Sequence, residues 1–411
     1  MALKRPFALP QAWTKALAAE LRAIERRGLT RSIVTPESGP EAHAILGGKR
    51  YIHFTSNNYL GLSADPRLIE AANAATSRYG AGASASRLLC GSTPLHEELE
   101  RCIAKLKRTE ASLLFSSGYL ANVGLISALT GPGDLLLSDS LNHASIIDGA
   151  RLSRAATAVY RHCDLNDVEA HLKKTKAKRK LVYTESLFSM DGDLAPLPGL
   201  IALAERYGAL LVIDEAHATG ILGRDGAGAL SHFGIKRGPV VVMGTLSKAL
   251  GSAGGFVAGD ITLIRFLINR CRTFIFNTAL PAGSVAAALA AIDVVAQEPW
   301  RRESVLALAQ RLRDGFRALG YPETPSQSQI VPLVIGEAPA AVAMEKRLKD
   351  AGILAKAIRP PTVPKGTSRI RFNLMATHTE KDLDKVLQAL KSSSYPPLPR
   401  WERTSRSERR G

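Results

Sequence analysis

Five short runs of apolar residues, most of them separated by segments long enough for a helix, constrain the fold of this chain most. The runs are 111–115 (ASLLF), 134–137 (DLLL), 181–184 (LVYT), 209–213 (ALLVI) and 239–243 (PVVVM). Strands that are apolar on both faces and alternate with helices are typical of a mainly parallel sheet covered on both sides. The sequence therefore predicts an α/β fold with a mainly parallel central sheet flanked by helices.

The length of 411 residues allows two or three domains. We expect four parts: an N-terminal helical arm with a small segment (1–50), a large α/β domain (51–285), a smaller α+β C-terminal domain (286–394) and a basic flexible tail (395–411). The arm should form an amphipathic helix, because apolar residues recur there at helical spacing, at Trp13, Leu17, Leu21 and Ile24. In the C-terminal part we expect strands near 329–335, 353–358 and 368–374, and helices near 285–319, 340–351 and 380–392.

Capping residues predict two helix starts. Thr93 stands before Pro94, the favoured first helical residue, which indicates a helix that runs to Lys107. Thr379 is followed three residues later by Asp382, which resembles a capping box at the start of the last helix.

The net charge of +17 raises the alternative of a basic nucleic-acid-binding protein, because cationic surfaces bind phosphate backbones. The excess is concentrated at the ends, since residues 1–32 carry seven basic and two acidic residues and residues 395–411 carry five and two. No C-x2-C pair or RNP-type aromatic motif accompanies the charge. We therefore expect no nucleic-acid partner, and expect the positive rim to attract an anionic substrate.

The four cysteines lie far apart and form no C-x-x-C pair: Cys90, Cys102, Cys163 and Cys271. This usage is typical of thiols in a reducing compartment. No stretch approaches the ~18 apolar residues of a membrane span, and the first residues contain no signal-peptide core. We expect a cytoplasmic protein with no membrane association, no disulfide and no metal site.

Polar residues follow the predicted strands at their carboxyl ends. They are Ser116-Ser117-Gly118, Ser138-Asp139, Glu185-Ser186, Asp214-Glu215 and Gly244-Thr245. Ligands of open α/β sheets bind beyond the carboxyl ends of the strands. The sequence therefore predicts one site that collects these residues.

One lysine stands in a glycine-rich turn just after a predicted buried strand. In the segment Thr245-Leu-Ser-Lys248-Ala-Leu-Gly251, burial would lower the pKa of Lys248 toward the neutral amine that Schiff-base chemistry requires. The hydroxyls of Thr245 and Ser247 could bind a phosphate. By itself the pattern more often marks a surface lysine in a flexible loop.

A carboxylate and a histidine follow another predicted strand, in Asp214-Glu-Ala-His217. A buried Asp214 beside a ring nitrogen would keep that nitrogen protonated, as an electron-sink cofactor needs. A metal ligand pair and a structural Asp cap are the alternatives at this point.

Two further motifs carry weaker signals. His143, in Asn142-His143-Ala-Ser145, follows a strand end, although a lone histidine is more often structural. Ser117-Gly118-Tyr119 stand at a strand-to-helix junction, where free N–H groups can hold phosphate or simply form a capped turn. The absence of a Walker A motif, or of G-x-G-x-x-G after a strand, argues against nucleotide hydrolases and dinucleotide enzymes.

Taken in this order, the motifs resemble those of fold-type I pyridoxal-phosphate (PLP) enzymes. Within that group the chain is similar over nearly its whole length to the α-oxoamine synthase family, which condenses an amino acid with an acyl thioester. The blocks that carry the resemblance are Asn57-Asn-Tyr-Leu-Gly-Leu62, Asp139-x3-His143-Ala-Ser, Glu185-Ser-Leu-Phe-Ser189-Met-Asp-Gly-Asp193, Asp214-Glu-Ala-His217 and the lysine turn.

The resemblance implies PLP as the cofactor and the fold of a fold-type I transferase. Lys248 would join the cofactor covalently and later move the Cα proton, His143 would stack on its ring, and Asp214 would pair with the ring nitrogen. His217, together with Ser189, would bond the phenolic oxygen.

The resemblance also implies positions for the phosphate and the substrate. The phosphate-binding residues would be Ser117, Gly118, Tyr119, Thr245 and, from the other subunit, Thr278. The substrate-binding residues would be Asn57, Arg31 and Arg359.

The block at 357–371 (AIRPPTVPKGTSRIR) is most similar to the branch of the family that uses L-alanine and a pimeloyl thioester in biotin biosynthesis. The resemblance therefore implies a decarboxylative condensation with pimeloyl-CoA or pimeloyl-acyl carrier protein, in a homodimer with shared active sites. The alternatives are a sibling such as 2-amino-3-oxobutyrate CoA ligase, which uses glycine and acetyl-CoA, or serine palmitoyltransferase. The alternative from a different class is a basic nucleic-acid-binding protein on a degenerate enzyme fold.

Overall fold

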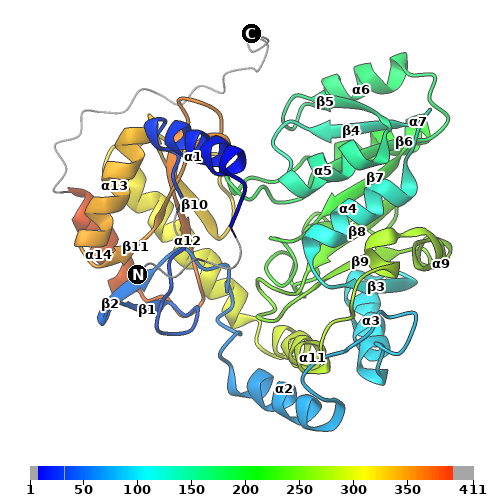
Figure 1. Cartoon of the computed structure of the whole chain (residues 1–411), viewed down its shortest axis with the longest axis horizontal. Coiled ribbons are helices and arrows are strands. Elements are labelled where there is room, and N and C mark those ends of the chain that lie inside the picture. Colours follow the sequence, from blue (N-terminus) through cyan, green and yellow to red (C-terminus); the bar gives the residue numbers. More distant parts are fainter. Residues whose placement is uncertain (1–7, 32, 392–411) are drawn as a thin grey trace.

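A computed structural model gives the fold and describes residues 8–31 and 33–391. The predicted basic tail, 395–411, lies outside the described residues. Figure 1 shows two lobes, one built on a large sheet and the other on two small sheets with the last helices.

The large lobe is built on a seven-stranded sheet. Its strands are β3 (Ala111–Phe115), β4 (Leu135–Asp139), β5 (Ala156–Tyr160), β6 (Lys180–Glu185), β7 (Leu210–Asp214), β8 (Val240–Thr245) and β9 (Gly255–Gly259). In the sheet order β3-β9-β8-β7-β6-β4-β5, the five strands from β8 to β5 run parallel, and β9 is antiparallel to both β8 and β3. The predicted mainly parallel sheet is confirmed, and all five apolar runs are strands in it.

Both faces of this sheet are buried. Leu211 and Ile213 of β7 enter one apolar cluster, and Val212 between them enters another. Alternate residues of one strand thus contribute to two cores, as expected for a sheet covered on both sides. The helices between and around these strands are α2 (Pro66–Tyr79), α3 (Pro94–Lys107), α4 (Gly118–Leu129), α5 (Ala144–Ser153), α6 (Leu165–Lys174), α7 (Leu197–Tyr207), α8 (Ala229–His232), α9 (Ile261–Arg270), α10 (Arg272–Ile275) and α11 (Ala282–Gln297).

The small lobe combines both ends of the described chain. One sheet contains β10 (Ile330–Gly336), β13 (Ser368–Asn373) and β12 (Lys356–Ile358), and the other contains β1 (His43–Leu46), β2 (Lys49–His53) and β11 (Ile353–Leu354). The helices of this lobe are α1 (Gln11–Arg26), α12 (Trp300–Ala318), α13 (Ala338–Asp350) and α14 (Glu380–Lys391). Since β2 of the N-terminal segment pairs with β11, that segment shares a sheet with the C-terminal part. The predicted division of the chain into four parts stays a prediction.

The predicted single strand at 353–358 is wrong. It is two short strands, because β11 pairs in parallel with β2 while β12 pairs antiparallel with β13, in a different sheet. The interruption at Ala355 lets the chain pass from one sheet to the other.

Both predicted helix starts are confirmed. α3 begins at Pro94, and Thr93 N donates to His96 Nδ1 at 3.1 Å. At α14, Thr379 N donates to Asp382 Oδ2 at 2.8 Å, and Asp382 N donates back to Thr379 Oγ1 at 3.3 Å, which completes a capping box.

The predicted amphipathic helix in the arm is α1. Its apolar residues Trp13, Leu17 and Leu21 are exposed in the single chain. Over residues 8–31 and 33–391, no helix combines the length and the apolar character needed to span a membrane.

Candidate active site

Lys248 lies in the turn that joins β8 to β9, and its side chain is partly buried. Its Nζ lies 2.8 Å from His217 Nε2. Burial lowers the pKa of this amine to about 8, although attraction to Asp214 and Glu185 opposes the shift. The neutral amine that a nucleophilic lysine needs is therefore accessible near physiological pH.

Two carboxylates stand side by side at neighbouring strand ends. Glu185 ends β6 and Asp214 ends β7, and the two are register partners in the parallel pair. Asp214 Oδ2 accepts a hydrogen bond from Asn122 Nδ2, and Oδ1 accepts one from Ala216 N, both at 2.8 Å. Burial raises the pKa of Glu185 to about 8, and the negative charge of Asp214 adds to the rise. Glu185 can therefore hold a proton near neutral pH, whereas each oxygen of Asp214 accepts an N–H donor.

His217 connects the lysine with a chain of polar groups. Burial lowers the pKa of His217 well below its usual value, and the charge of Lys248 adds to this, so the ring is neutral with one donor nitrogen. With Lys248 donating to Nε2, Nδ1–H donates to Tyr59 Oη at 2.6 Å, and Tyr59 donates to Asn57 Oδ1 at 3.0 Å. Arg371 Nη2 donates to the same Asn57 Oδ1 at 3.2 Å and to Tyr59 Oη at 3.4 Å. A continuous chain of hydrogen bonds thus links Lys248 with Arg371.

A second network links His143 with Asp214. His143 precedes α5 and caps its first turn, since Ser145 N donates to His143 Nδ1 at 3.2 Å. Asn122 Nδ2 donates at 2.8 Å to Ser145 Oγ and at 2.8 Å to Asp214 Oδ2. His143 as a residue is exposed, and the partial burial of its ring lowers the pKa of the imidazole.

The N-terminus of α4 lies against the end of β8. Ser117 caps the helix by accepting a hydrogen bond from Leu120 N at 3.2 Å. A Cβ atom added to Gly118 would lie 3.5 Å from Thr245 Cβ, and Thr245 Oγ1 lies 2.8 Å from Ser247 Oγ. Helix N–H groups beside two hydroxyls can hold a phosphate group.

The remaining predicted binding residues differ in their surroundings. Ser189 is buried, and its N–H donates to Glu185 Oε2 at 3.1 Å. The carbonyl oxygen of Thr278 accepts a hydrogen bond from Ser116 Oγ at 2.8 Å, directly before the cap of α4. Tyr119 is exposed, and its hydroxyl donates to Asp148.

The two arginines that the sequence analysis names as substrate-binding lie at the N-terminal arm. Arg359 Nη1 donates to Gly28 O at 2.5 Å, and Arg31 is exposed in the segment after α1. Hydrogen bonds to Asn57 and Tyr59 instead bring Arg371 into the site. The role of Arg31 and Arg359 in substrate binding stays a prediction.

The family profile described as aminotransferase class I and II matches residues 49–390, most of the chain. The chain belongs to the class I and II aminotransferase family. One similar protein is the putative 8-amino-7-oxononanoate synthase of Geobacillus kaustophilus (strain HTA426). It is 48% identical over 376 residues, which span 91% of this chain and 96% of the relative.

Two solved structures resemble this class I and II aminotransferase fold. Serine palmitoyltransferase from S. paucimobilis with bound PLP-myriocin aldimine is 32% identical, with a TM-score of 0.86, over 93% of this chain and 98% of that one. The 8-amino-7-oxononanoate synthase of Francisella tularensis is 28% identical, with a TM-score of 0.73, over 83% of this chain and 96% of that one.

Several polar residues of this class I and II aminotransferase site were absent from the sequence-based prediction. Arg371 is the main one, and the signal for it was present: Arg369 and Arg371 alternate with the apolar Ile370 and Phe372 in the predicted strand. Glu185 belongs to one of the motifs named in the sequence analysis, but no function was predicted for it. The other residues that tie the networks together are Tyr59, Asn122 and Ser145.

Proposed function

We propose that this chain catalyses the PLP-dependent condensation of L-alanine with a pimeloyl thioester, which yields 8-amino-7-oxononanoate, CO2 and the free thiol. The observation that carries the proposal is the amine of Lys248, whose pKa burial lowers to about 8, beside His217 and the carboxylate pair. Similarity to 8-amino-7-oxononanoate synthases supports the choice of substrates.

The residues present fit PLP by their chemistry. Lys248 offers an amine for the aldehyde, Asp214 offers a carboxylate for the pyridinium nitrogen, and the α4 N-terminus with Thr245 offers donors for the phosphate. Two buried atoms, Glu185 Oε1 and Arg371 Nε, have no hydrogen-bond partner within the part of the chain that the structure describes. Buried polar atoms normally have hydrogen-bond partners, so these two atoms support the binding of a polar ligand at this place.

When bound, PLP supplies an aldehyde that condenses with amines and a ring that accepts the electron pair left by a departing Cα substituent. Asp214 would hold the ring nitrogen protonated, which would strengthen that acceptor. Lys248 Nζ would take the proton from the alanine Cα and return one at the end. The guanidinium of Arg371, with Asn57, binds the alanine carboxylate until it leaves as CO2.

The acyl carbon of the thioester forms the new bond to the alanine Cα, and the thiol leaves. CoA and acyl carrier protein remain two forms of the acyl donor in this proposal. The four free cysteines support a reducing compartment, and we place the reaction in the cytoplasm.

We also infer a homodimer with shared sites. Leu89 and Phe276 are 81% and 71% exposed, and a bridge between Ser86 and Thr278 brings their two segments together. Exposed apolar clusters of this kind mark protein interfaces. Thr278 bonds Ser116 beside α4, so a partner that covers this patch would lie next to the phosphate-binding end.

A sibling activity is the second candidate. Serine palmitoyltransferase activity is considered because the backbone of that enzyme matches 93% of this chain with a TM-score of 0.86. Its 32% identity is lower than the 48% identity to an 8-amino-7-oxononanoate synthase, so the alanine and pimeloyl pair stays the first choice.

Substrate competition tests the proposal. Purified protein with PLP is assayed with L-alanine and pimeloyl-CoA, glycine and acetyl-CoA, and L-serine and palmitoyl-CoA. We expect the highest kcat/KM with the first pair. A clear preference for another pair refutes the choice of substrates, and the absence of PLP binding refutes the enzyme class.

A further inference from the structure

A histidine outside the proposed site lies between two buried carboxylates. His162 Nδ1 is 2.9 Å from Asp139 Oδ1, and Nε2 is 2.8 Å from Asp193 Oδ2. The carboxylate side chains are 1% and 5% exposed. A neutral imidazole has a single N–H, so donation to both carboxylates requires the imidazolium. Burial alone would lower the pKa of His162, but the bonds to Asp139 and Asp193 raise it to about 12.

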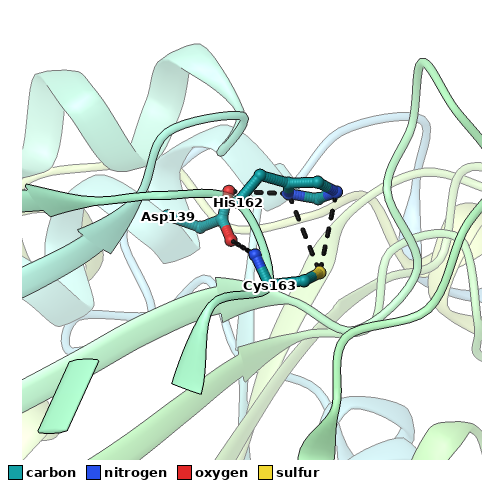
Figure 2. A group of neighbouring side chains, drawn as sticks. All are labelled: Asp139, His162 and Cys163. Carbon is teal, nitrogen blue, oxygen red and sulfur yellow. Dashed lines mark hydrogen bonds and ion pairs between the residues drawn. The ribbon is translucent and has the colours of Figure 1, made fainter. Parts of the chain in front are cut away.

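A metal site is the competing interpretation of this cluster. Figure 2 shows Asp139, His162 and Cys163 together, and their ligand atoms lie within 4.8 Å of one another. A metal needs a ring nitrogen without a proton and a deprotonated thiol. Both nitrogens of His162 instead face carboxylate oxygens at hydrogen-bond distance, and burial raises the pKa of the Cys163 thiol. The geometry therefore favours an ion-pair cluster.

On one side of His162, Asp139 holds the turn that leads to His143. Asp139 Oδ1 accepts a hydrogen bond from Leu141 N at 2.8 Å, and its carbonyl accepts one from Asn142 N at 3.2 Å. Asn142 Oδ1 in turn accepts one from Glu185 N at 3.0 Å. Asp139 thus fixes the path of the chain from β4 to His143.

On the other side, Asp193 belongs to the loop that carries Ser189. Within this loop Phe188 N donates to Asp193 O at 2.9 Å, and the Phe188 ring packs edge-on against His162 with centroids 4.4 Å apart. The neighbouring Asp191 pairs with Arg369 of β13, the strand that also carries Arg371. The loop that contains Ser189, Asp191 and Asp193 thus contacts both the ring of His162, through Asp193, and the arginine strand, through Asp191.

We propose that His162 is a positioning residue, which holds the turn before His143 and the loop of Ser189 at a fixed separation around the cofactor site. It acts through Asp139 and Asp193. This inference rests on the proposed function, since it concerns the geometry of the PLP site.

Three variants test the role: His162→Gln, Asp193→Asn and the double variant. The readouts are the Kd for PLP, the visible circular dichroism per bound PLP, which reports the orientation of the ring, and the melting temperature without PLP. Arg179→Gln is the matched control. It breaks the Arg179–Asp134 pair (2.6 Å) at the amino ends of β4 and β6, away from the site.

We expect His162→Gln to weaken PLP binding about tenfold and to reduce the circular dichroism, because supporting contacts set the orientation of binding groups. The control should change neither. The double variant should bind PLP no more weakly than the single variant with the higher Kd, because both changes remove the same contact between His162 and Asp193. If His162→Gln does not fold, Asp193→Asn carries the same expectation, since it keeps the shape of the side chain.

A wild-type Kd and dichroism in a folded His162→Gln protein would overturn the inference, as would additive losses in the double variant. Zinc bound stoichiometrically in the purified wild type would overturn the ion-pair assignment. If the wild type takes up no PLP, the proposed function fails and the inference with it. If the wild type binds PLP and the variants bind it equally well, the proposed function stands and only the inference fails.

Discussion

Replacing Lys107 by methionine removes a buried cation next to the segment that carries Asp214 and His217. Lys107 Nζ donates to Glu215 Oε2 at 2.5 Å, to Ala227 O at 2.6 Å and to Thr219 Oγ1 at 2.8 Å. Both side chains of the Lys107–Glu215 pair are only 1% exposed. Methionine keeps the length of the apolar stem, so the change removes charge and hydrogen bonds with little change of volume.

The expected loss follows from the charge left behind. Removing one partner of a buried ion pair costs about 3–5 kcal/mol, because the other charge stays buried without compensation. Glu215 Oε1 keeps one good donor, Ala229 N at 2.7 Å, so we expect the lower end, about 3 kcal/mol. A Lys107→Met/Glu215→Gln protein holds no uncompensated charge, and we expect it to regain about 2 kcal/mol of that loss.

Urea denaturation of the apoprotein at fixed pH measures these differences. Lys105→Met is the matched control, because Lys105 lies exposed on the same helix and should change stability by less than about 0.5 kcal/mol. The reasoning fails if Lys107→Met costs no more than the control, or if the double variant is less stable than the single one.

Three further perturbations address the site. PLP uptake by the apoprotein should accelerate as pH rises through about 8, because the neutral fraction of Lys248 grows there; a stopped-flow rate that is flat between pH 6.5 and 9.5 contradicts this. Arg371→Lys should raise the KM for L-alanine about tenfold with an unchanged PLP absorbance, since lysine lacks the planar fork, and an unchanged KM argues for another carboxylate ligand. Gly255→Ala would place a Cβ 2.7 Å from Gly118 N and should weaken PLP binding. Gly259→Ala on the same strand would place its Cβ against side chains, Leu263 at 3.1 Å and Val241 at 3.8 Å, and should leave PLP binding unchanged. Equal PLP affinities in titrations of both variants would exclude the phosphate position.

The central sheet could be predicted because its signal is local. Runs such as 209–213 are apolar on both faces, and that pattern by itself indicates a buried parallel strand. Edge strand β5 was missed, and it differs from the other runs in that three of its five residues are exposed rather than buried on both faces. β9 was missed because its apolar run is short and bounded by Gly255 and Gly259. At Gly255 a side chain is excluded by the close approach of the Gly118 backbone.

The site could be predicted where motifs follow strand ends. Lys248 and His217 lie on one hydrogen-bond network, and His143 and Asp214 lie on a second, although their roles stay proposals. Contacts between distant segments could not be predicted, because no local pattern shows that Arg371 reaches Asn57 across 314 positions.

The division of the strand at 353–358 has the same cause. Its halves pair with β2 and β13, and a choice between two sheets is made by tertiary pairing.

The most direct test of the account is reduction of the PLP-loaded protein with borohydride, followed by peptide mapping. The account predicts one phosphopyridoxyl group per chain on the peptide that contains Lys248, and none in Lys248→Ala. Labelling of a different lysine, or a Lys248→Ala protein that is labelled like the wild type, would contradict it.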